Sequence, residues 1–431
     1  MTADLAITNA TVVTMDPVGT VHDGATVLVD GATITSVGRL DGPVDARRTI
    51  DARGSIVLPG FVNGHTHLAM TMFRGLADDL DLERFLSRLL PAEGALLTDE
   101  TVAAGTTLAI AECFLSGITT AIDMYFFPEA STAVAEAAGF DLRHGPVFVE
   151  FPGPDERSFA DRLAWAGDLL TATDPARRWV CPHSTYLLDE GQLAAVAALA
   201  AEHGARVHVH ACETAAELGL VHDRHGRTPV EVLRDTGLLG PGTVLGHGVH
   251  LTDADIELLA ASGAVVSHCP ASNQKLASGF ARIPELLASG VPVALGTDGA
   301  ASANDLDLWL AMRLAAYPLA ARTGVGTVDA ADVLAMATTG GSRAAGAPEI
   351  GSIEVGTRAD LVVLDPSSPS LTPTFDPVST AVYAASRADV RWVVAGGQLV
   401  VDDRRLTTLD VDRAIAAVRE LSPRILAVTG R

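Results

Sequence analysis

Lysine is almost absent from this sequence, and positive charge as a whole is scarce. Lys275 is the single lysine, and 30 basic residues stand against 53 acidic ones, which gives a formal net charge of −23. A charge of this sign repels the phosphates of nucleic acids and of anionic lipid surfaces. The composition therefore argues against a nucleic-acid or membrane partner, although it remains compatible with a small nucleoside.

Cysteine is also rare, and long apolar runs are missing. Four cysteines in 431 residues do not build a disulfide framework, which agrees with a reducing compartment. No stretch reaches the roughly 18 apolar residues of a membrane-spanning helix, and residues 1–16 lack the parts of a secretory signal. We therefore expect a soluble, cytoplasmic protein.

Short β-rich segments alternate with longer helical ones over most of the chain. The helical segments are rich in Ala and Leu, begin with a polar N-cap and end near a Gly. Eight such alternations predict a parallel (β/α)8 barrel of the TIM type. The strand candidates cover residues 55–62, 117–124, 142–150, 178–184, 205–211, 243–249, 264–270 and 292–298.

Both ends of the chain have a different pattern. Residues 4–54, and again the segments 359–366 and 390–401, carry alternating or β-branched runs broken by Gly and Asp. Two β-rich ends around an α/β centre predict one small β-sandwich domain built from both termini. The expected division is 1–56 and 353–406 for this domain, 57–352 for the barrel and 407–431 for a C-terminal helix.

Histidines gather where the predicted barrel strands end. His65 and His67 stand two apart, so their side chains share one face of the first strand and meet the mouth of the barrel. This pair alone is a weak sign of metal binding. The sign becomes stronger because other strand ends also carry groups that can bind a metal or move protons. These are His183, His210, His247, His268 and Asp298.

Imidazoles and a carboxylate on one rim can hold a divalent ion. Such a set leaves one coordination position open for water, whose pKa falls to about 7. Attack on a heteroaromatic carbon also needs a group that relays protons, and Glu213, just beyond His210, suits that task. His208 lies on the same strand face as His210, but we expect it to be an ordinary core residue.

Five segments of the sequence resemble the amidohydrolase superfamily. They read HTH at 65–67, HACE at 210–213, GHGVH at 246–250, SHCPASNQKLASG at 267–279 and LGTDGAAS at 295–302. More narrowly, they are similar to its S-adenosylhomocysteine/5′-methylthioadenosine deaminase branch, which is close to the chlorohydrolases and related to cytosine deaminases. The similarity extends over nearly the whole chain and implies a (β/α)8 hydrolase barrel.

The resemblance implies a site for one zinc ion per subunit, with Fe2+ or Mn2+ as alternatives. In this sequence the implied ligands are His65, His67, His210 and Asp298. Asp298 would also help to deprotonate the attacking water, and His247 would orient that water. Glu213 would relay protons and contact the substrate.

Other residues match substrate-contacting positions of this family. Glu93 corresponds to a carboxylate that accepts hydrogen bonds from ribose hydroxyls, and His183 and His268 are expected beside the substrate. The family's arginines for a homocysteine carboxylate have no secure match here, because Arg143 and Arg157 only lie near the corresponding positions. Nucleosides without that carboxylate need no such clamp.

The implied activity is deamination of an adenine nucleoside: 5′-methylthioadenosine, 5′-deoxyadenosine, adenosine or S-adenosylhomocysteine. Hydrolysis of a triazine, guanine or pterin, and a non-catalytic binding role, are the alternatives. A metal pair bridged by carboxylated lysine is not expected, since Lys275 lies past the seventh strand candidate. We expect a homo-oligomer, and residues 70–76 fit a subunit contact or a pocket wall equally well.

Overall fold

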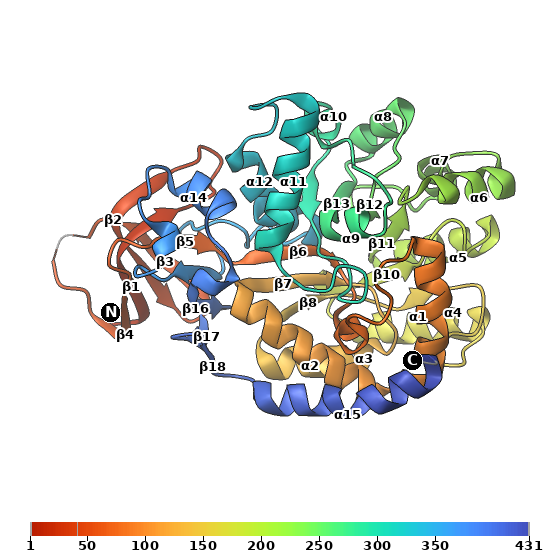
Figure 1. The fold of residues 1–431 in the computed structure, drawn as a ribbon, viewed down its shortest axis with the longest axis horizontal. Helices are drawn as coiled ribbons and strands as arrows, with labels where there is room; N and C mark the ends of the chain where they lie inside the picture. The colour runs from red at the N-terminus through yellow and green to blue at the C-terminus, as the bar shows by residue number, and fades with distance from the viewer. Residues whose placement is uncertain (1, 41, 430–431) are drawn as a thin grey trace.

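The computed structural model of this chain describes residues 2–40 and 42–429. In Figure 1 the strands from the two ends of the chain gather on one side, coloured red and blue. The remaining strands lie in the middle of the molecule, with helices around them (Figure 1). A β-rich part made from both ends and an α/β centre are therefore present side by side.

The terminal part is one sheet of nine strands. β15 pairs antiparallel with β5, so the two ends of the chain meet in the middle of this sheet. The path runs β18-β17-β16-β15-β5-β1-β2-β3, and β4 pairs with β1. The bounds are β1 Ala3–Val13, β2 Val21–Asp30, β3 Thr33–Gly38, β4 Ala46–Asp51, β5 Ile56–Pro59, β15 Leu361–Leu364, β16 Val390–Ala395, β17 Gln398–Asp402 and β18 Arg405–Leu406.

The central strands pair in parallel, as predicted for a TIM-type barrel. They form two arcs, β6-β7-β8 and β9-β10-β11-β12-β13-β14. The segment after β14 returns to β6, where the Asp298 amide donates to the His65 carbonyl at 3.0 Å. The bounds are β6 Phe61–Thr66, β7 Ile118–Asp123, β8 Asp141–Arg143, β9 Val147–Phe148, β10 Trp179–Pro182, β11 Arg206–Ala211, β12 Thr243–His247, β13 Val265–His268 and β14 Val293–Leu295.

The first predicted barrel strand, residues 55–62, is wrong as a single strand. Its first half is β5, which belongs to the terminal sheet, and the barrel begins only with β6. The chain passes between the two at Gly60, where a Cβ would lie 2.4 Å from Thr119 Oγ1. Only glycine permits this close approach. The third candidate is also divided, into β8 and β9.

Helices surround the barrel, and their ends follow the caps seen in the sequence. α5 begins with a capping box between Asp189 and Gln192, and it ends at Gly204 in the left-handed conformation. The bounds are α1 Leu82–Leu96, α2 Asp99–Ser116, α3 Pro128–Ala138, α4 Phe159–Ala172, α5 Glu190–His203, α6 Ala215–His225, α7 Pro229–Asp235, α8 Asp253–Ser262, α9 Pro270–Lys275, α10 Ile283–Ala288, α11 Leu308–Thr323, α12 Ala330–Ala337, α13 Thr339–Ala345, α14 Pro377–Tyr383 and α15 Val411–Thr429. Short 3-10 helices are η1 Leu68–Phe73, η2 Pro175–Arg177, η3 Pro369–Leu371 and η4 Arg387–Asp389.

An ion-pair cluster joins the barrel to the terminal sheet. Asp141, at the start of β8, is buried and lies within bonding distance of the guanidinium groups of Arg143, Arg177 and Arg358. Arg358 comes from the loop before β15, so this carboxylate connects the two parts of the molecule.

No helix in the described ranges is both long and apolar enough to cross a membrane.

Candidate active site

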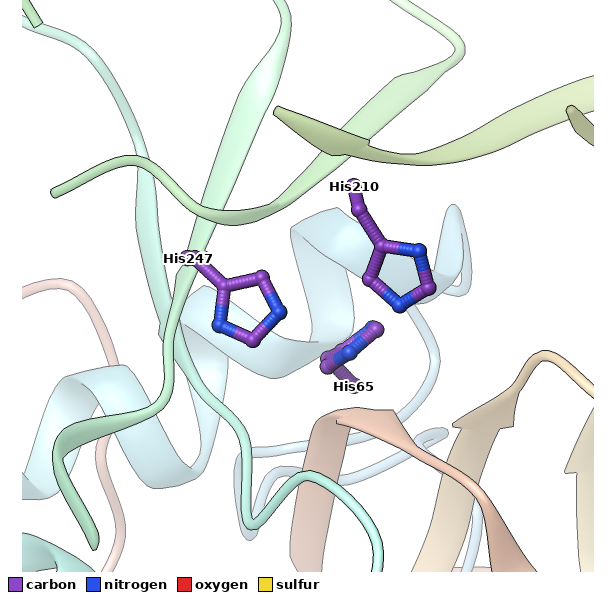
Figure 2. Close-up of side chains that lie close together, drawn as sticks. All are labelled: His65, His210 and His247. Atoms are coloured by element: carbon purple, nitrogen blue, oxygen red, sulfur yellow. The ribbon is translucent and has the colours of Figure 1, made fainter. Parts of the chain in front are cut away.

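Four chain segments carry imidazole and carboxylate groups to one end of the barrel. His65 lies in β6, His210 in β11 and His247 at the end of β12, while Asp298 follows β14. Figure 2 shows the rings of His65, His210 and His247 turned toward one another from their separate strands. These positions are the carboxyl ends of parallel strands, where barrel enzymes place their active sites.

The ring nitrogens at the centre of this group are free to bind a cation. His67 Nδ1 donates to the Met124 carbonyl at 2.6 Å, and His210 Nδ1 donates to the His183 carbonyl at 2.9 Å. The proton of each ring is therefore on Nδ1, and the two Nε2 lone pairs face each other at 3.2 Å. Two lone pairs at this distance repel unless a positive charge lies beside them.

The carboxylate of Asp298 completes this set of donors. Its Oδ1 lies 3.2 Å from His67 Nε2 and 3.6 Å from His65 Nε2, and the latter nitrogen has no hydrogen-bond partner among the described residues. Burial raises the pKa of Asp298, but the neighbouring imidazoles of His65 and His67 outweigh burial and hold that pKa well below its usual range. Ser302 Oγ donates to Oδ2 at 2.7 Å and fixes the carboxylate.

The pKa of His67 also indicates that this place favours a positive charge. Burial alone lowers it, but the Asp298 carboxylate outweighs burial and raises it to about 9. Three imidazoles and one ionised carboxylate that converge in a buried place are a donor set that suits a divalent metal such as Zn2+. His65, His67, His210 and Asp298 are therefore the residues that suit a metal here.

His247 differs from His67 and His210 in its proton position. Asn273 Nδ2 donates to His247 Nδ1 at 3.0 Å, which leaves the ring proton on Nε2. That nitrogen lies 3.7 Å from Glu213 Oε2. His65, His210 and His247 also lie close enough to form a metal trio. We favour the set with His67 and Asp298, because Nε2 of His247 carries a proton and acts as a donor.

Glu213 is a buried carboxyl group beside His247. Its Oε1 has no partner among the described residues. Burial, with the charges of Asp298 and Glu217 nearby, raises the pKa of Glu213 well above its usual range. A raised pKa favours the protonated form of this carboxyl group, which can deliver its proton to a bound base.

A cavity of about 500 Å³ opens above these groups. Glu93, from α1, lies in its wall and is 5% exposed. Tyr125, just after β7, donates its hydroxyl to Glu93 Oε1 at 2.6 Å. Burial raises the pKa of Glu93 to about 7. A carboxylate held in this way can accept hydrogen bonds from a vicinal diol.

Comparison with known proteins agrees with this geometry. The model of the amidohydrolase family matches residues 56–400. The chain belongs to the amidohydrolase family. The 5-methylthioadenosine/S-adenosylhomocysteine deaminase of Syntrophobacter fumaroxidans is 44% identical over 429 residues, covering 97% of this chain and 98% of the relative.

Two further relatives of this amidohydrolase match over nearly their whole length. The 5′-deoxyadenosine deaminase of Methanosarcina mazei is 41% identical over 434 residues, which covers 99% of both chains. A crystal structure of an adenosine deaminase from Xanthomonas campestris with bound zinc has a TM-score of 0.94 and 37% identity, again with 99% of both chains covered. The family resemblance and the TIM-type barrel expected from the motifs are confirmed.

The structure brings most of the predicted site residues of this amidohydrolase together. The cavity is lined by His67, Glu93, His183, His210, Glu213, His247 and Asp298, and His65 is fully buried beneath it. His268 is buried and does not line the cavity, so its predicted contact with the substrate stays a prediction without support. Arg143 bonds Asp141, and Arg157 pairs with Asp155 and lies over the Trp165 ring.

Several residues of the site were missed in the sequence. His208, expected to be an ordinary core residue, is buried, but its Nε2 also bonds His65 Nδ1 at 2.7 Å and so orients a candidate ligand. Tyr125, Asn273 and Ser302 were not singled out either. Asn273 and Ser302 lie within the quoted motifs, and Tyr125 comes directly after a strand end, which is the signal that would have found it.

Proposed function

We propose that this amidohydrolase is a zinc-dependent aminohydrolase that converts an adenine nucleoside and water into the hypoxanthine nucleoside and ammonia. The observation that carries the proposal is the layout of one cavity. It has the histidine and carboxylate cluster at its base and the Glu93–Tyr125 pair in its wall. The names of the three relatives described above support the same reaction.

His65, His67, His210 and Asp298 would hold the zinc ion. Zinc at such a site supplies Lewis acidity and lowers the pKa of a bound water to about 7. His208, through His65, and Ser302, through Asp298, keep two of these ligands in place. Fe2+ and Mn2+ remain alternatives for the same donors.

Proton transfer is assigned to residues around the base of the cavity. Glu213, whose raised pKa favours the protonated form, donates to the ring nitrogen next to the amino-bearing carbon. Asp298 is ionised and accepts a proton from the attacking water, while His247 donates through Nε2 to the oxygen that adds to the carbon. Glu213 then recovers a proton from the hydroxyl group that was added to the carbon, and the proton taken up by Asp298 leaves with ammonia, so both residues return to their starting states.

The upper wall of the cavity favours a small apolar group at the 5′ position. Within residues 2–40 and 42–429, the lining contains no lysine or arginine, and Glu156 is acidic. Both features disfavour a carboxylate-bearing 5′ group such as that of S-adenosylhomocysteine. 5′-Deoxyadenosine and 5′-methylthioadenosine suit the wall better. The apolar side chains there include Phe85, Leu86, Leu89, Met124, Phe126 and Val149.

A substrate panel tests this proposal. Ammonia release is measured with zinc-loaded protein and adenosine, 5′-deoxyadenosine, 5′-methylthioadenosine, S-adenosylhomocysteine, adenine, guanine, a pterin and an amino-triazine. We expect the highest kcat/KM for the first three nucleosides. Turnover of a free base or triazine alone would contradict the nucleoside assignment.

Glu93 provides the matched variant for this panel. Glu93→Ala should lower kcat/KM for nucleosides by about 100-fold, since two hydrogen bonds to a charged group are lost. Any slow reaction with adenine should stay unchanged, because adenine has no ribose. Equal losses for adenine and nucleosides would show that Glu93 does not read the sugar.

Four finer features are part of the proposal. The sheet from both termini is proposed to close as a small sandwich, supported by the buried cluster that β1, β2, β5 and β15 share. The domain limits expected from the sequence, 1–56, 57–352, 353–406 and 407–431, are proposed with the first boundary moved to Gly60, because β5 pairs within the terminal sheet. A homo-oligomer is supported by the exposed, stacked rings of Tyr317 and Tyr383, and a cytoplasmic location by four free cysteines.

A further inference from the structure

Glu217 is a buried carboxylate that the proposed reaction does not use. It lies in the first turn of α6, is 3% exposed and does not line the cavity. Its Oε1 accepts a hydrogen bond from the Cys212 amide at 2.9 Å, and its Oε2 accepts one from the Glu213 amide at 2.6 Å. The carboxylate thus holds the backbone from which the Glu213 side chain extends.

Other helices show that this arrangement goes beyond an ordinary helix start. In α7, Glu231 occupies the same helix position and accepts a bond from the amide of its own N-cap, Thr228, at 2.9 Å. The Glu217 amide donates to the side chain of its N-cap, Thr214, as is usual at a helix start. Its carboxylate, however, accepts hydrogen bonds from the amides of the two residues before that cap, Cys212 and Glu213. The start of α6 alone does not require those two bonds.

The backbone under these bonds has an unusual conformation. Cys212 is a non-glycine residue with a φ of 56°, in the left-handed region. In a continuous extended strand, residues three apart point to opposite faces. The left-handed turn at Cys212 interrupts that alternation between the two residues, and both His210 and Glu213 line the cavity. Amides of Val249 and His250 donate to the Cys212 carbonyl, each at 2.8 Å, and hold the other side of the turn.

We propose that Glu217 is a positioning residue, which fixes the left-handed turn at Cys212 and thereby aims the Glu213 carboxyl group at the substrate ring. This inference rests on the proposed role of Glu213. Glu217 touches neither the substrate nor the metal ligands; besides the effect of its charge on the pKa of Glu213, it acts on that residue through the backbone. Loss of its carboxylate should therefore slow the chemical step and leave substrate and zinc binding intact.

Steady-state kinetics of Glu217 variants test the inference. Glu217→Gln keeps one acceptor oxygen, and we expect kcat to fall by about 10- to 100-fold, the range found for groups that orient catalytic ligands. Glu217→Ala should lose more. KM should change by less than about threefold and zinc content should stay at the parent level, as expected for a group that acts only in the chemical step. Glu231→Gln, the matched control in α7, should keep kcat within about twofold, because its carboxylate caps only its own helix.

A double variant separates positioning from general destabilisation. If Glu217 acts through Glu213, then Glu213→Gln together with Glu217→Gln should be no slower than Glu213→Gln alone. Multiplied losses would overturn the inference. A kcat for Glu217→Gln within twofold of the parent enzyme would overturn it as well.

Amide hydrogen exchange tests the same inference without turnover. Exchange at Cys212 and Glu213 should be at least tenfold faster in Glu217→Gln than in the parent protein, and unchanged in Glu231→Gln. Equal protection in the Glu217 variant would overturn the inference even if no substrate reacts. If the parent enzyme releases no ammonia from nucleosides, the proposed function fails, and the exchange result still decides the role of Glu217.

Discussion

Replacing Tyr125 by phenylalanine should change the pH dependence of nucleoside binding. Tyr125 donates to Glu93 Oε1 at 2.6 Å inside the cavity wall. Burial raises the pKa of Glu93 to about 7, and the bond from Tyr125 opposes that rise. Burial also raises the pKa of Tyr125 well above its usual range, so the hydroxyl remains a donor throughout an assay.

The size of the change follows from the strength of that bond. A hydrogen bond to a charged group contributes about 1.5 to 3 kcal/mol, which corresponds to about one to two pKa units. The pKa of Glu93 in Tyr125→Phe should therefore lie between about 8 and 9. At pH 7.5 the ionised fraction of Glu93, and with it kcat/KM for nucleosides, should fall by about 3- to 25-fold.

The assay is kcat/KM for 5′-deoxyadenosine between pH 6 and pH 10. Glu93 is an acid with a raised pKa, so it is neutral below that pKa and binds the ribose diol best above it. Activity of Tyr125→Phe should therefore recover near pH 9.5, and the variant should have no further effect in a Glu93→Gln background. A loss that is the same at every pH would refute this explanation.

Three further variants, and one control variant, test the structure more broadly. Asp141→Asn should lower the free energy of unfolding by about 3 to 5 kcal/mol at pH 7, because three guanidinium groups lose their buried counter-charge. Burial raises the pKa of Asp141, but the arginines outweigh burial and lower it. The difference in unfolding free energy between Asp141→Asn and the parent protein should therefore shrink as pH falls through that lowered pKa. The control variant Asp402→Asn, in a more exposed pair, should lower the free energy of urea unfolding by less than about 1 kcal/mol. His65→Ala should remove most bound zinc, as measured by elemental analysis, and full zinc content would refute its role as a ligand. Lys275→Met should keep its zinc, since Nζ bonds Asp78 Oδ1 at 2.7 Å, and metal loss would contradict this.

The barrel was predictable because its signals are local. Most helices of the α/β centre begin with a polar side chain that caps the first turn, and several end at a glycine that the structure places in the left-handed region, as at Gly117, Gly204 and Gly263. The change from terminal sheet to barrel was not predictable. β5 and the start of β6 lie in one largely apolar segment, residues 55–62, and only their pairing partners, far away in the sequence, separate them.

The site was predictable where it depends on strand ends. His65, His210 and His247 lie on different strands, and parallel strands in a closed barrel bring their ends together. Pairs between side chains could not be predicted in this way. Nothing in the local sequence links Glu93 to Tyr125 or His65 to His208, because these bonds arise only when distant segments fold together.

Glu217 illustrates a third case. Its spacing from Thr214 is that of an ordinary helix start, and the sequence gives no reason to look further. Only the atomic contacts show that the carboxylate reaches beyond the cap to the amides of Cys212 and Glu213. Helix-start carboxylates next to catalytic turns therefore need inspection in three dimensions.

The most direct test of the proposed function is a zinc titration of metal-free protein, followed by ammonia release from 5′-deoxyadenosine. We expect activity to rise linearly to one zinc per chain and then level off, with Glu213→Gln binding the same amount of zinc but releasing little ammonia. Full activity in metal-free protein, or in the Glu213 variant, would contradict the assignment of this site as a zinc-dependent nucleoside deaminase.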